Sequence, residues 1–177
     1  MTPTPTATPT IRILGICGSL QAASSNLTLL EQAITLAPEG TLVRLSDKLR
    51  ELPLFNPDLE SPEAPEPVLR WREAIDAHDG LLIACPEYGH SLPGPLKNGL
   101  DWLIGSGELD RKVIAITAST NFAERGRMGL AALRGVLVAV NARILGGEPI
   151  VRGPGAEDAL RKLLCQIADE ARVKIQV

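Results

Sequence analysis

Apolar positions follow two patterns along the chain, and each pattern predicts one kind of element. The run IRILGIC at 11–17 is rich in β-branched residues and ends in a Gly-Ser turn, so we expect a strand there. After Asn26 the apolar residues fall at helical spacing instead: Leu27, Leu30, Ile34 and Ala37. Pro38 and Gly40 then stop the helix, and the run at 41–45 predicts a second strand.

Two later runs, GLLIAC at 80–85 and KVIAITA at 112–118, are apolar throughout. Continuous apolar strands are buried on both faces, which is typical of parallel sheets covered by helices. A further short strand is expected near 143–151. The helices expected between and after these strands occupy 68–78, 93–104, a segment after the loop at 119–127, and a segment from Ala156 onward.

The last two predicted helices show a buried face clearly. Their apolar stripes consist of Leu130, Leu133, Leu137 and Val140 in one helix, and Leu160, Leu163, Leu164 and Ile167 in the other. The repeated strand-helix order predicts an α/β fold with an open parallel sheet between two helical layers. Ligands bind such sheets outside the carboxyl ends of the strands. We therefore expect one pocket to collect the loops at 18–26, 85–95 and 119–127.

Composition narrows the class of protein. With 177 residues, 45% hydrophobic and 22% charged, the chain suits one folded domain over 11–177. The Thr- and Pro-rich segment at 1–10 has no secretory-signal pattern and predicts a disordered tail. A net charge of −3 with dispersed Lys and Arg argues against a nucleic-acid partner. No apolar run reaches the roughly 20 residues of a membrane span.

Cysteine usage indicates a reducing compartment. Cys17, Cys85 and Cys165 are odd in number and widely spaced, and the chain has two histidines, His78 and His90. This pattern favours neither a disulfide framework nor a metal site. We therefore expect a cytoplasmic protein without a bound metal.

The loop after the first strand, GICGSLQAASSN at 15–26, has the chemistry of an anion site. It leads into a helix N-terminus, where unpaired backbone N–H groups and the helix dipole favour negative charge. Gly18 permits close approach of the backbone, and four polar side chains follow it: Ser19, Ser24, Ser25 and Asn26. The alternative is a tight turn with Ser24 or Ser25 as a helix cap. Neither a P-loop nor a G-x-G-x-x-G fingerprint is present.

Two motifs together resemble one family. GSLQAASSN resembles the phosphate loop G-S-x-R-x-x-S-x-N of the NAD(P)H-dependent FMN reductases. PEYGHSLPGPLKNGLDW, which begins at Pro86, resembles their flavin-ring loop P-E-Y-N-x-S-x-P-G-x-L-K-N-x-x-D-W. LPLFNPDLE and DGLLIACPEY are similar to the family as well, so the likeness covers roughly residues 11–140.

The resemblance implies a flavodoxin-like three-layer sandwich whose five-stranded parallel sheet has the order 2-1-3-4-5. It also implies noncovalently bound FMN, NADPH or NADH as hydride donor, and self-association to a dimer or tetramer with flavin sites near the subunit interfaces. Members reduce quinones, azo dyes, chromate or free flavins. Because the flavin carries the chemistry, no catalytic side chain is expected.

The same resemblance assigns the cofactor contacts. On the phosphate side they are Ser19, Gln21, Ser24, Ser25 and Asn26. Beside the flavin ring they are Pro86, Glu87, Tyr88, Gly89, Ser91, Ser119 and Thr120, with the 86–91 loop acting largely through its backbone. Gln21 replaces the family arginine, which predicts weaker FMN binding without its loss. Gly89 replaces a family asparagine, which predicts a wider pocket.

Several residues near these loops have two interpretations. Lys97, Asn98 and Asp101 are either catalytic or, as we expect, support for the loop or for a dimer contact. His90 is either an exposed loop histidine or a proton donor to a reduced quinone.

The cysteine thiols and the arginines of the 119–127 loop also have two interpretations each. Cys17 and Cys85 end adjacent predicted strands and form either a redox pair or ordinary buried thiols. Arg125 and Arg127 either meet the NADPH phosphate or belong to the surface.

The leading hypothesis for function is an FMN-dependent NAD(P)H oxidoreductase that acts on quinones or similar acceptors by a ping-pong route. One alternative is a flavodoxin-type electron carrier, against which the small charge of −3 argues. The other is a flavin-free interaction module that retains the fold, which Gln21 and Gly89 favour.

Overall fold

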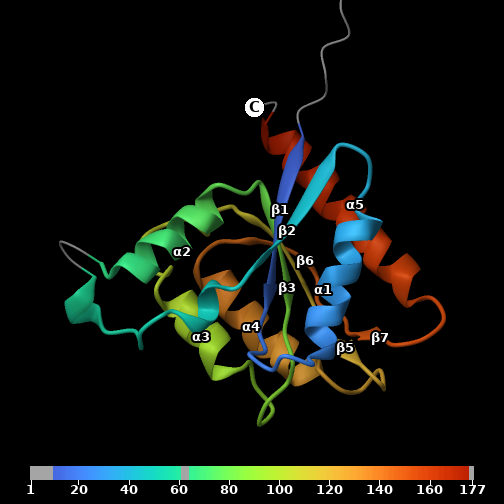
Figure 1. Ribbon diagram of the computed structural model, residues 1–177, viewed down its shortest axis with the longest axis horizontal. Helices are drawn as coiled ribbons and strands as arrows, with labels where there is room; N and C mark the ends of the chain where they lie inside the picture. Colours follow the sequence, from blue (N-terminus) through green and yellow to red (C-terminus); the bar gives the residue numbers. More distant parts are fainter. Residues whose placement is uncertain (1–9, 61–63, 176–177) are drawn as a thin grey trace, which may run out of the picture.

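The computed structural model describes residues 10–60 and 64–175, so the predicted tail at 1–10 lies outside the described residues except for Thr10. A five-stranded parallel sheet crosses the centre of the molecule between two helical layers (Figure 1). Its order is β2-β1-β3-β4-β6, with the bounds Thr41–Ser46, Ile11–Cys17, Gly80–Ala84, Val113–Thr117 and Arg143–Gly146. This confirms the predicted order; the last strand is numbered β6 because a short strand, β5, precedes it in the chain.

The helices divide between the two faces of the sheet (Figure 1). One face is covered by α1 (Ser25–Leu36) and α5 (Ala156–Ile175). The other is covered by α2 (Glu66–Asp76), α3 (Gly94–Asp101) and α4 (Arg127–Ala139), and two short 3₁₀ turns, Lys48–Arg50 and Pro57–Leu59, precede α2. β3 and β4 are buried along their whole length, because both of their faces are covered, and this explains their unbroken apolar runs.

Helix α1 is confirmed, but the apolar residues whose spacing predicted it are not all buried. Ile34 is 47% exposed, while the residues turned inward are Asn26, Leu29, Leu30, Ala33 and Leu36. Asn26 accounts for this rotation, because its side-chain oxygen accepts a hydrogen bond from the Ser119 N–H at 2.9 Å. The inward face therefore begins with a polar residue, which a search for apolar periodicity passes over.

The strand predicted near 143–151 is two strands. β6 pairs with β4, whereas β7 (Ile150–Val151) leaves the main sheet and pairs in parallel with β5 (Ser119–Thr120), inside the predicted 119–127 loop. Gly146, the last residue of β6, and Gly147 after it have φ of 66° and 109°, a conformation that residues other than glycine rarely adopt. This turn sends the chain from the main sheet to the edge of the predicted pocket.

The carboxyl ends of the central strands are held close together. The Gly18 N–H donates to the Ala84 carbonyl at 2.9 Å, and the Cys85 N–H donates to the Thr117 carbonyl at 2.8 Å. A Cβ on Gly18 would lie 3.0 Å from Leu96 and 3.1 Å from Pro86, so the first loop requires glycine in order to approach the second. Within the described residues, no helix is both long enough and apolar enough to cross a membrane.

Candidate functional site

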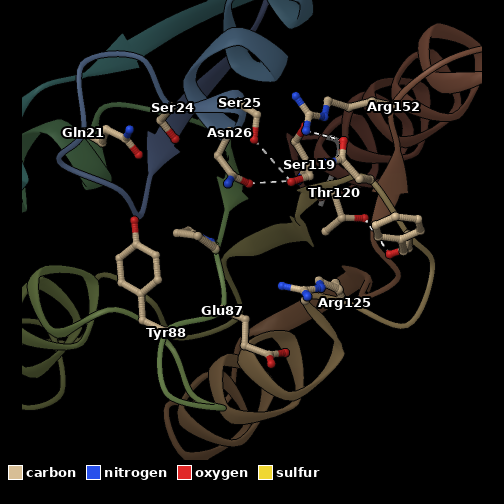
Figure 2. A pocket seen from close by; sticks show the side chains of 14 residues that line it. Gln21, Ser24, Ser25, Asn26, Glu87, Tyr88, Ser119, Thr120, Arg125 and Arg152 are labelled. Carbon is tan, nitrogen blue, oxygen red and sulfur yellow. Dashed lines mark hydrogen bonds between the residues drawn. The ribbon is translucent and has the colours of Figure 1, made fainter.

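A cavity of about 480 Å³ opens at the carboxyl ends of the strands (Figure 2), a volume within the usual range for small-molecule sites. All three predicted loops contribute to it. Nine of the predicted cofactor contacts line it: Gln21, Ser24, Ser25, Asn26, Pro86, Glu87, Tyr88, Ser119 and Thr120. Ser19, Gly89 and Ser91 do not.

The first turn of α1 forms one wall of the cavity. Within the described residues, its N-terminus, the positive end of the helix dipole, has neither a capping side chain nor an acidic residue. Ser24 occupies the N-cap position, yet its side chain makes no capping hydrogen bond, and the first turn contains no acidic residue. A serine at this position usually accepts a hydrogen bond from the helix backbone. The turn thus leaves backbone donors and the helix dipole available, as a bound phosphate group requires.

Asn26 and Ser25 fix this turn against β5. Asn26 is 4% exposed, and while its oxygen binds Ser119, its amide nitrogen faces the cavity (Figure 2). The Ser25 hydroxyl donates to the Ser119 carbonyl at 3.4 Å. Two segments about 90 residues apart in the chain are therefore locked together beside the cavity, with one amide donor left for a ligand.

Ser19 lies behind the cavity wall and connects two loops. Its hydroxyl is 3.0 Å from the Tyr88 hydroxyl and accepts a hydrogen bond from the Gln21 N–H at 3.2 Å. Ser19 is buried and belongs to a different hollow, together with Arg50. In this structure its side chain joins the 18–26 loop to the 86–91 loop.

Glu87 caps α4. One of its carboxylate oxygens accepts hydrogen bonds from the Met128 and Gly129 N–H groups at 3.0 and 3.3 Å. Desolvation by burial raises the pKa of this carboxyl, but the hydrogen bonds from Gly129, Met128 and His90 outweigh it and hold the pKa below its usual value. A Cβ on Gly129 would lie 3.1 Å from the Glu87 Cα, so the 86–88 backbone rests directly on α4.

The tip of this loop is a tight turn outside the cavity. Tyr88 and Ser91 exchange two backbone hydrogen bonds of 3.0 and 3.1 Å, and Gly89 and His90 between them have φ of 57° and 60°. A Cβ on Gly89 would meet nothing within 4 Å, and Gly89 does not line the cavity. His90 has a 76% exposed side chain, 3.3 Å from the Glu87 carboxylate, as expected for a loop histidine.

The thiols of Cys85 and Cys17, which end adjacent strands, have raised pKa values. Desolvation by burial and the negative charge of Glu87 raise the pKa of Cys85 to about 12. Burial also raises the pKa of Cys17, more than its hydrogen bonds with the Ser19 backbone and the Ser24 side chain lower it. Both thiols therefore stay protonated at neutral pH, which favours their interpretation as buried, unreactive groups.

The polar residues of α3 support a neighbouring segment. Asn98 accepts a hydrogen bond from the Phe55 N–H at 2.7 Å and donates to the Pro53 carbonyl at 2.9 Å. Lys97 pairs with Asp101 at 2.6 Å. None of these three α3 side chains lines the cavity, in agreement with the supporting role expected for α3.

Two arginines line the cavity, and one of them was not expected. Arg125 comes from the loop before α4, whereas Arg127, which follows it, instead pairs with Glu148 at 3.7 Å. Arg152 follows β7 and escaped the sequence-based prediction, because β7 was not recognised as a separate strand. The Gly-Gly-x-Pro sequence at 146–149 was the available signal for a break there. The other unpredicted residues of the wall are Asn121, Phe122 and Gly126.

Comparison with known proteins identifies the family. The sequence profile of the family described as NADPH-dependent FMN reductase matches residues 11–153. The chain belongs to this family. Members of this family are oxidoreductases, and the family's description names FMN and NADPH, so membership implies FMN and NAD(P)H as cofactors. The alternative of a flavin-free interaction module is therefore not supported.

Individual relatives agree with this assignment. The chain is 37% identical over 170 residues to an NAD(P)H-dependent FMN reductase of Pseudomonas aeruginosa, covering 94% of this chain and 90% of that protein. It is 29% identical to a quinone reductase of Escherichia coli over 81% of this chain and 78% of that protein. Its fold is similar to that of FerB, a flavoenzyme NAD(P)H:(acceptor) oxidoreductase from Paracoccus denitrificans, with a TM-score of 0.78, 24% identity, and coverage of 91% and 97% of the two chains.

Proposed function

We propose that this FMN reductase family member takes a hydride from NADPH or NADH and delivers electrons to quinones and similar small acceptors through FMN held in the cavity of Figure 2. The observation that carries the proposal is the helix N-terminus left without a cap at one end of that cavity. When bound, FMN supplies the redox chemistry, so the protein has to bind and orient it and keep one face accessible.

We assign the FMN phosphate to the first turn of α1. Ser24 offers a hydroxyl group there and the Asn26 amide nitrogen faces the same space, while the Ser25 hydroxyl already donates to the Ser119 carbonyl. Backbone N–H groups at a helix N-terminus are aligned with the helix dipole, so they bind a phosphate without further rearrangement. Neutral donors of this kind support phosphate binding even though Gln21 stands in place of an arginine.

We assign the flavin ring to the space bordered by 86–88 and 119–120. Glu87 acts as a positioning residue, because its carboxylate is occupied by α4 and holds the 86–88 backbone in place. Its lowered pKa keeps it ionised at neutral pH, so it is not a proton donor. Protons for the reduced acceptor then come from solvent or from the exposed His90.

The acceptor class follows from the relatives' activities. The Escherichia coli relative is named a quinone reductase, which makes quinones the first acceptors to assay. Chromate, azo dyes and free flavins are further candidates. We also propose a cytoplasmic location, since the free thiols of Cys17, Cys85 and Cys165 suit a reducing compartment.

Self-association is a further part of the proposal. Tyr88 and Phe122 line the cavity and yet are 51% and 62% exposed, and Met128 nearby is 53% exposed. Large apolar side chains gathered at the rim of a site favour contact with another protein surface. Sedimentation velocity should show a dimer or tetramer at micromolar concentrations, and a monomer there would contradict self-association.

The test of the proposed activity is an anaerobic stopped-flow experiment on the FMN-loaded protein. NADPH should bleach the absorbance of bound flavin, and a benzoquinone should restore it. Double-reciprocal plots of the initial rate against NADPH concentration, at several fixed quinone concentrations, should be parallel lines. Flavin that binds but is not bleached by NADPH or NADH would indicate an electron carrier instead. A protein that binds no FMN would contradict both functions.

A further inference from the structure

We propose that Arg152 supplies the cation for the FMN phosphate that Gln21 does not provide. This assignment rests on the proposed function and adds a specificity-determining residue to its site. No arginine, lysine or histidine occurs between Gly18 and Asn26, so that loop offers a phosphate dianion only neutral donors. Hydrogen bonds between two charged groups are shorter and stronger than neutral ones, so a cation beside this loop would raise phosphate affinity.

Backbone pairing places Arg152 beside the first turn of α1. The Arg152 N–H donates to the Thr120 carbonyl at 2.8 Å, which continues the parallel pairing of β7 with β5. The residue before Thr120 is Ser119, whose backbone is hydrogen-bonded to the side chains of both Ser25 and Asn26. Arg152 is therefore one strand away from the residues assigned to the phosphate.

The side chain of Arg152 lies on the phosphate side of the cavity. Figure 2 shows its guanidinium extending from β7 toward Ser25. Arg152, Ser25 and Ser119 line both the main cavity and an adjoining groove between α1 and α5, which places the three at the junction of the two hollows.

The guanidinium is available for an anion. It donates a short hydrogen bond to the side-chain oxygen of Asn121, a neutral group that orients it without cancelling its charge. Glu157 lines the adjoining groove, but within the described residues Arg152 forms no ion pair with a carboxylate. An arginine held by a neutral partner at the edge of a cavity keeps its remaining donors for a ligand.

Two other arginines near the site are less well placed. Arg50 donates to the Leu20 carbonyl at 2.8 Å but lines a separate hollow and not the main cavity. Arg125 lines the cavity, but it does not line the adjoining groove that Arg152 shares with Ser25. Of the two arginines that line the cavity, Arg152 is thus the one that also shares the adjoining groove with Ser25.

The test compares two flavins that differ by the phosphate group. Apoprotein is titrated with FMN and with riboflavin while flavin fluorescence is followed. Arg152→Met should raise the Kd for FMN about tenfold, as expected for one charge-assisted contact, and leave the Kd for riboflavin unchanged. Arg161→Met, at an exposed position on α5, is the matched control and should change neither value.

Two further variants show whether a loss of FMN affinity comes from the missing charge or from damage to the fold. Adding Gln21→Arg to Arg152→Met should restore most of the FMN affinity, because it returns a cation to the same phosphate from the opposite side. Arg152→Lys should bind FMN with intermediate affinity, since it keeps the charge and loses the fork of donors. Circular dichroism and thermal melting of each variant confirm that the titrations compare folded proteins.

The outcomes distinguish a failure of the Arg152 assignment from a failure of the proposed function. If Arg152→Met binds FMN as tightly as the wild type, or loses FMN and riboflavin equally, Arg152 is not the phosphate cation, while the cofactor site stands. If the wild type binds neither flavin, the proposed function itself is wrong. The salt dependence of the FMN Kd should also fall in Arg152→Met, because one screened charge contact is removed.

Discussion

Two of the regions where polar side chains lie against the core differ in how their donors are used: the cavity at the carboxyl ends of the sheet, and the packing of α2 and α3 on the segment at 53–60. In the second region the donors are matched within the protein. Trp71 Nε1 donates to the Gly99 carbonyl at 2.8 Å, and Trp102 Nε1 donates to the Pro53 carbonyl at 2.9 Å. In the cavity, by contrast, Ser24 caps nothing and the Asn26 amide nitrogen faces open space.

The contrast shows how a ligand site differs from a structural network in the same fold. Buried polar groups are nearly always hydrogen-bonded, because an unpaired one costs about 1–3 kcal/mol. A network such as that of α2 and α3 avoids this cost internally. A wall with unused donors instead keeps them for water or for a ligand, and here these donors line one cavity at the end of the sheet where ligands bind.

The largest expected effect is on the structural side. Trp102 is 0% exposed and meets the Phe55 ring edge-on, with centroids 5.0 Å apart. Trp102→Ala should lower the free energy of unfolding by about 3–5 kcal/mol, since it empties a large buried volume and removes the hydrogen bond to Pro53. Chemical denaturation measures the loss, and Trp102→Phe should recover more than half of it. A loss below about 1 kcal/mol would show that this region is not a closed network.

A smaller loss is expected at Asn98. Asn98→Ala leaves the Phe55 N–H and the Pro53 carbonyl each with one partner fewer, so we expect about 2 kcal/mol of destabilisation. Lys97→Ala removes an ion pair whose lysine side chain is 43% exposed and should cost no more than about 0.5 kcal/mol. Equal costs for the two neighbours, measured by the same denaturation experiment, would contradict the supporting role of Asn98.

Glu87 lies in the first region but resembles the second, because it lines the cavity while its carboxylate is hydrogen-bonded within the protein to α4. Glu87→Gln should destabilise the protein by about 1 kcal/mol at pH 7, since the amide loses the charge that complements the helix N-terminus. The folded-state pKa lies below the ordinary value, so this stability is complete above that value, near pH 4.3, and disappears as the pH falls through the folded pKa.

The measurement is the unfolding free energy of wild type and Glu87→Gln from pH 3 to pH 8. The difference should be constant between about pH 6 and pH 8 and should shrink below about pH 4. A difference that grows on acidification would mean that the carboxyl is stabilised in its protonated form. His90→Ala separates the contribution of the exposed histidine, which should be minor.

Local pattern was sufficient for most of the fold and for the two motif loops. The apolar runs of β3 and β4 follow directly from burial on both faces, and the serine-rich turn follows from the chemistry of a helix N-terminus. The rotation of α1 was not accessible, because it depends on Asn26 meeting Ser119 far along the chain. Arg152 was missed for the same reason, since its place is set by the pairing of β7 with β5.

The smallest effect on stability is expected at Ser24. Replacing an N-cap serine by alanine usually costs about 0.5–2 kcal/mol, but this side chain makes no capping bond. Ser24→Ala should therefore change the unfolding free energy of the apoprotein by less than about 0.5 kcal/mol while weakening FMN binding severalfold. Thermal melting with and without FMN measures both effects, and a normal capping cost in the apoprotein would remove Ser24 from the set of unused donors.

Unmatched donors at the end of the sheet hold FMN in the function proposed above, and a crystal structure of the FMN-bound protein is the sharpest test. The phosphate should lie at the first turn of α1, within hydrogen-bonding distance of Ser24 or the Asn26 amide nitrogen, and the ring should lie between 86–88 and 119–120. Flavin bound elsewhere, or in this cavity with its phosphate turned away from α1, would contradict this proposal.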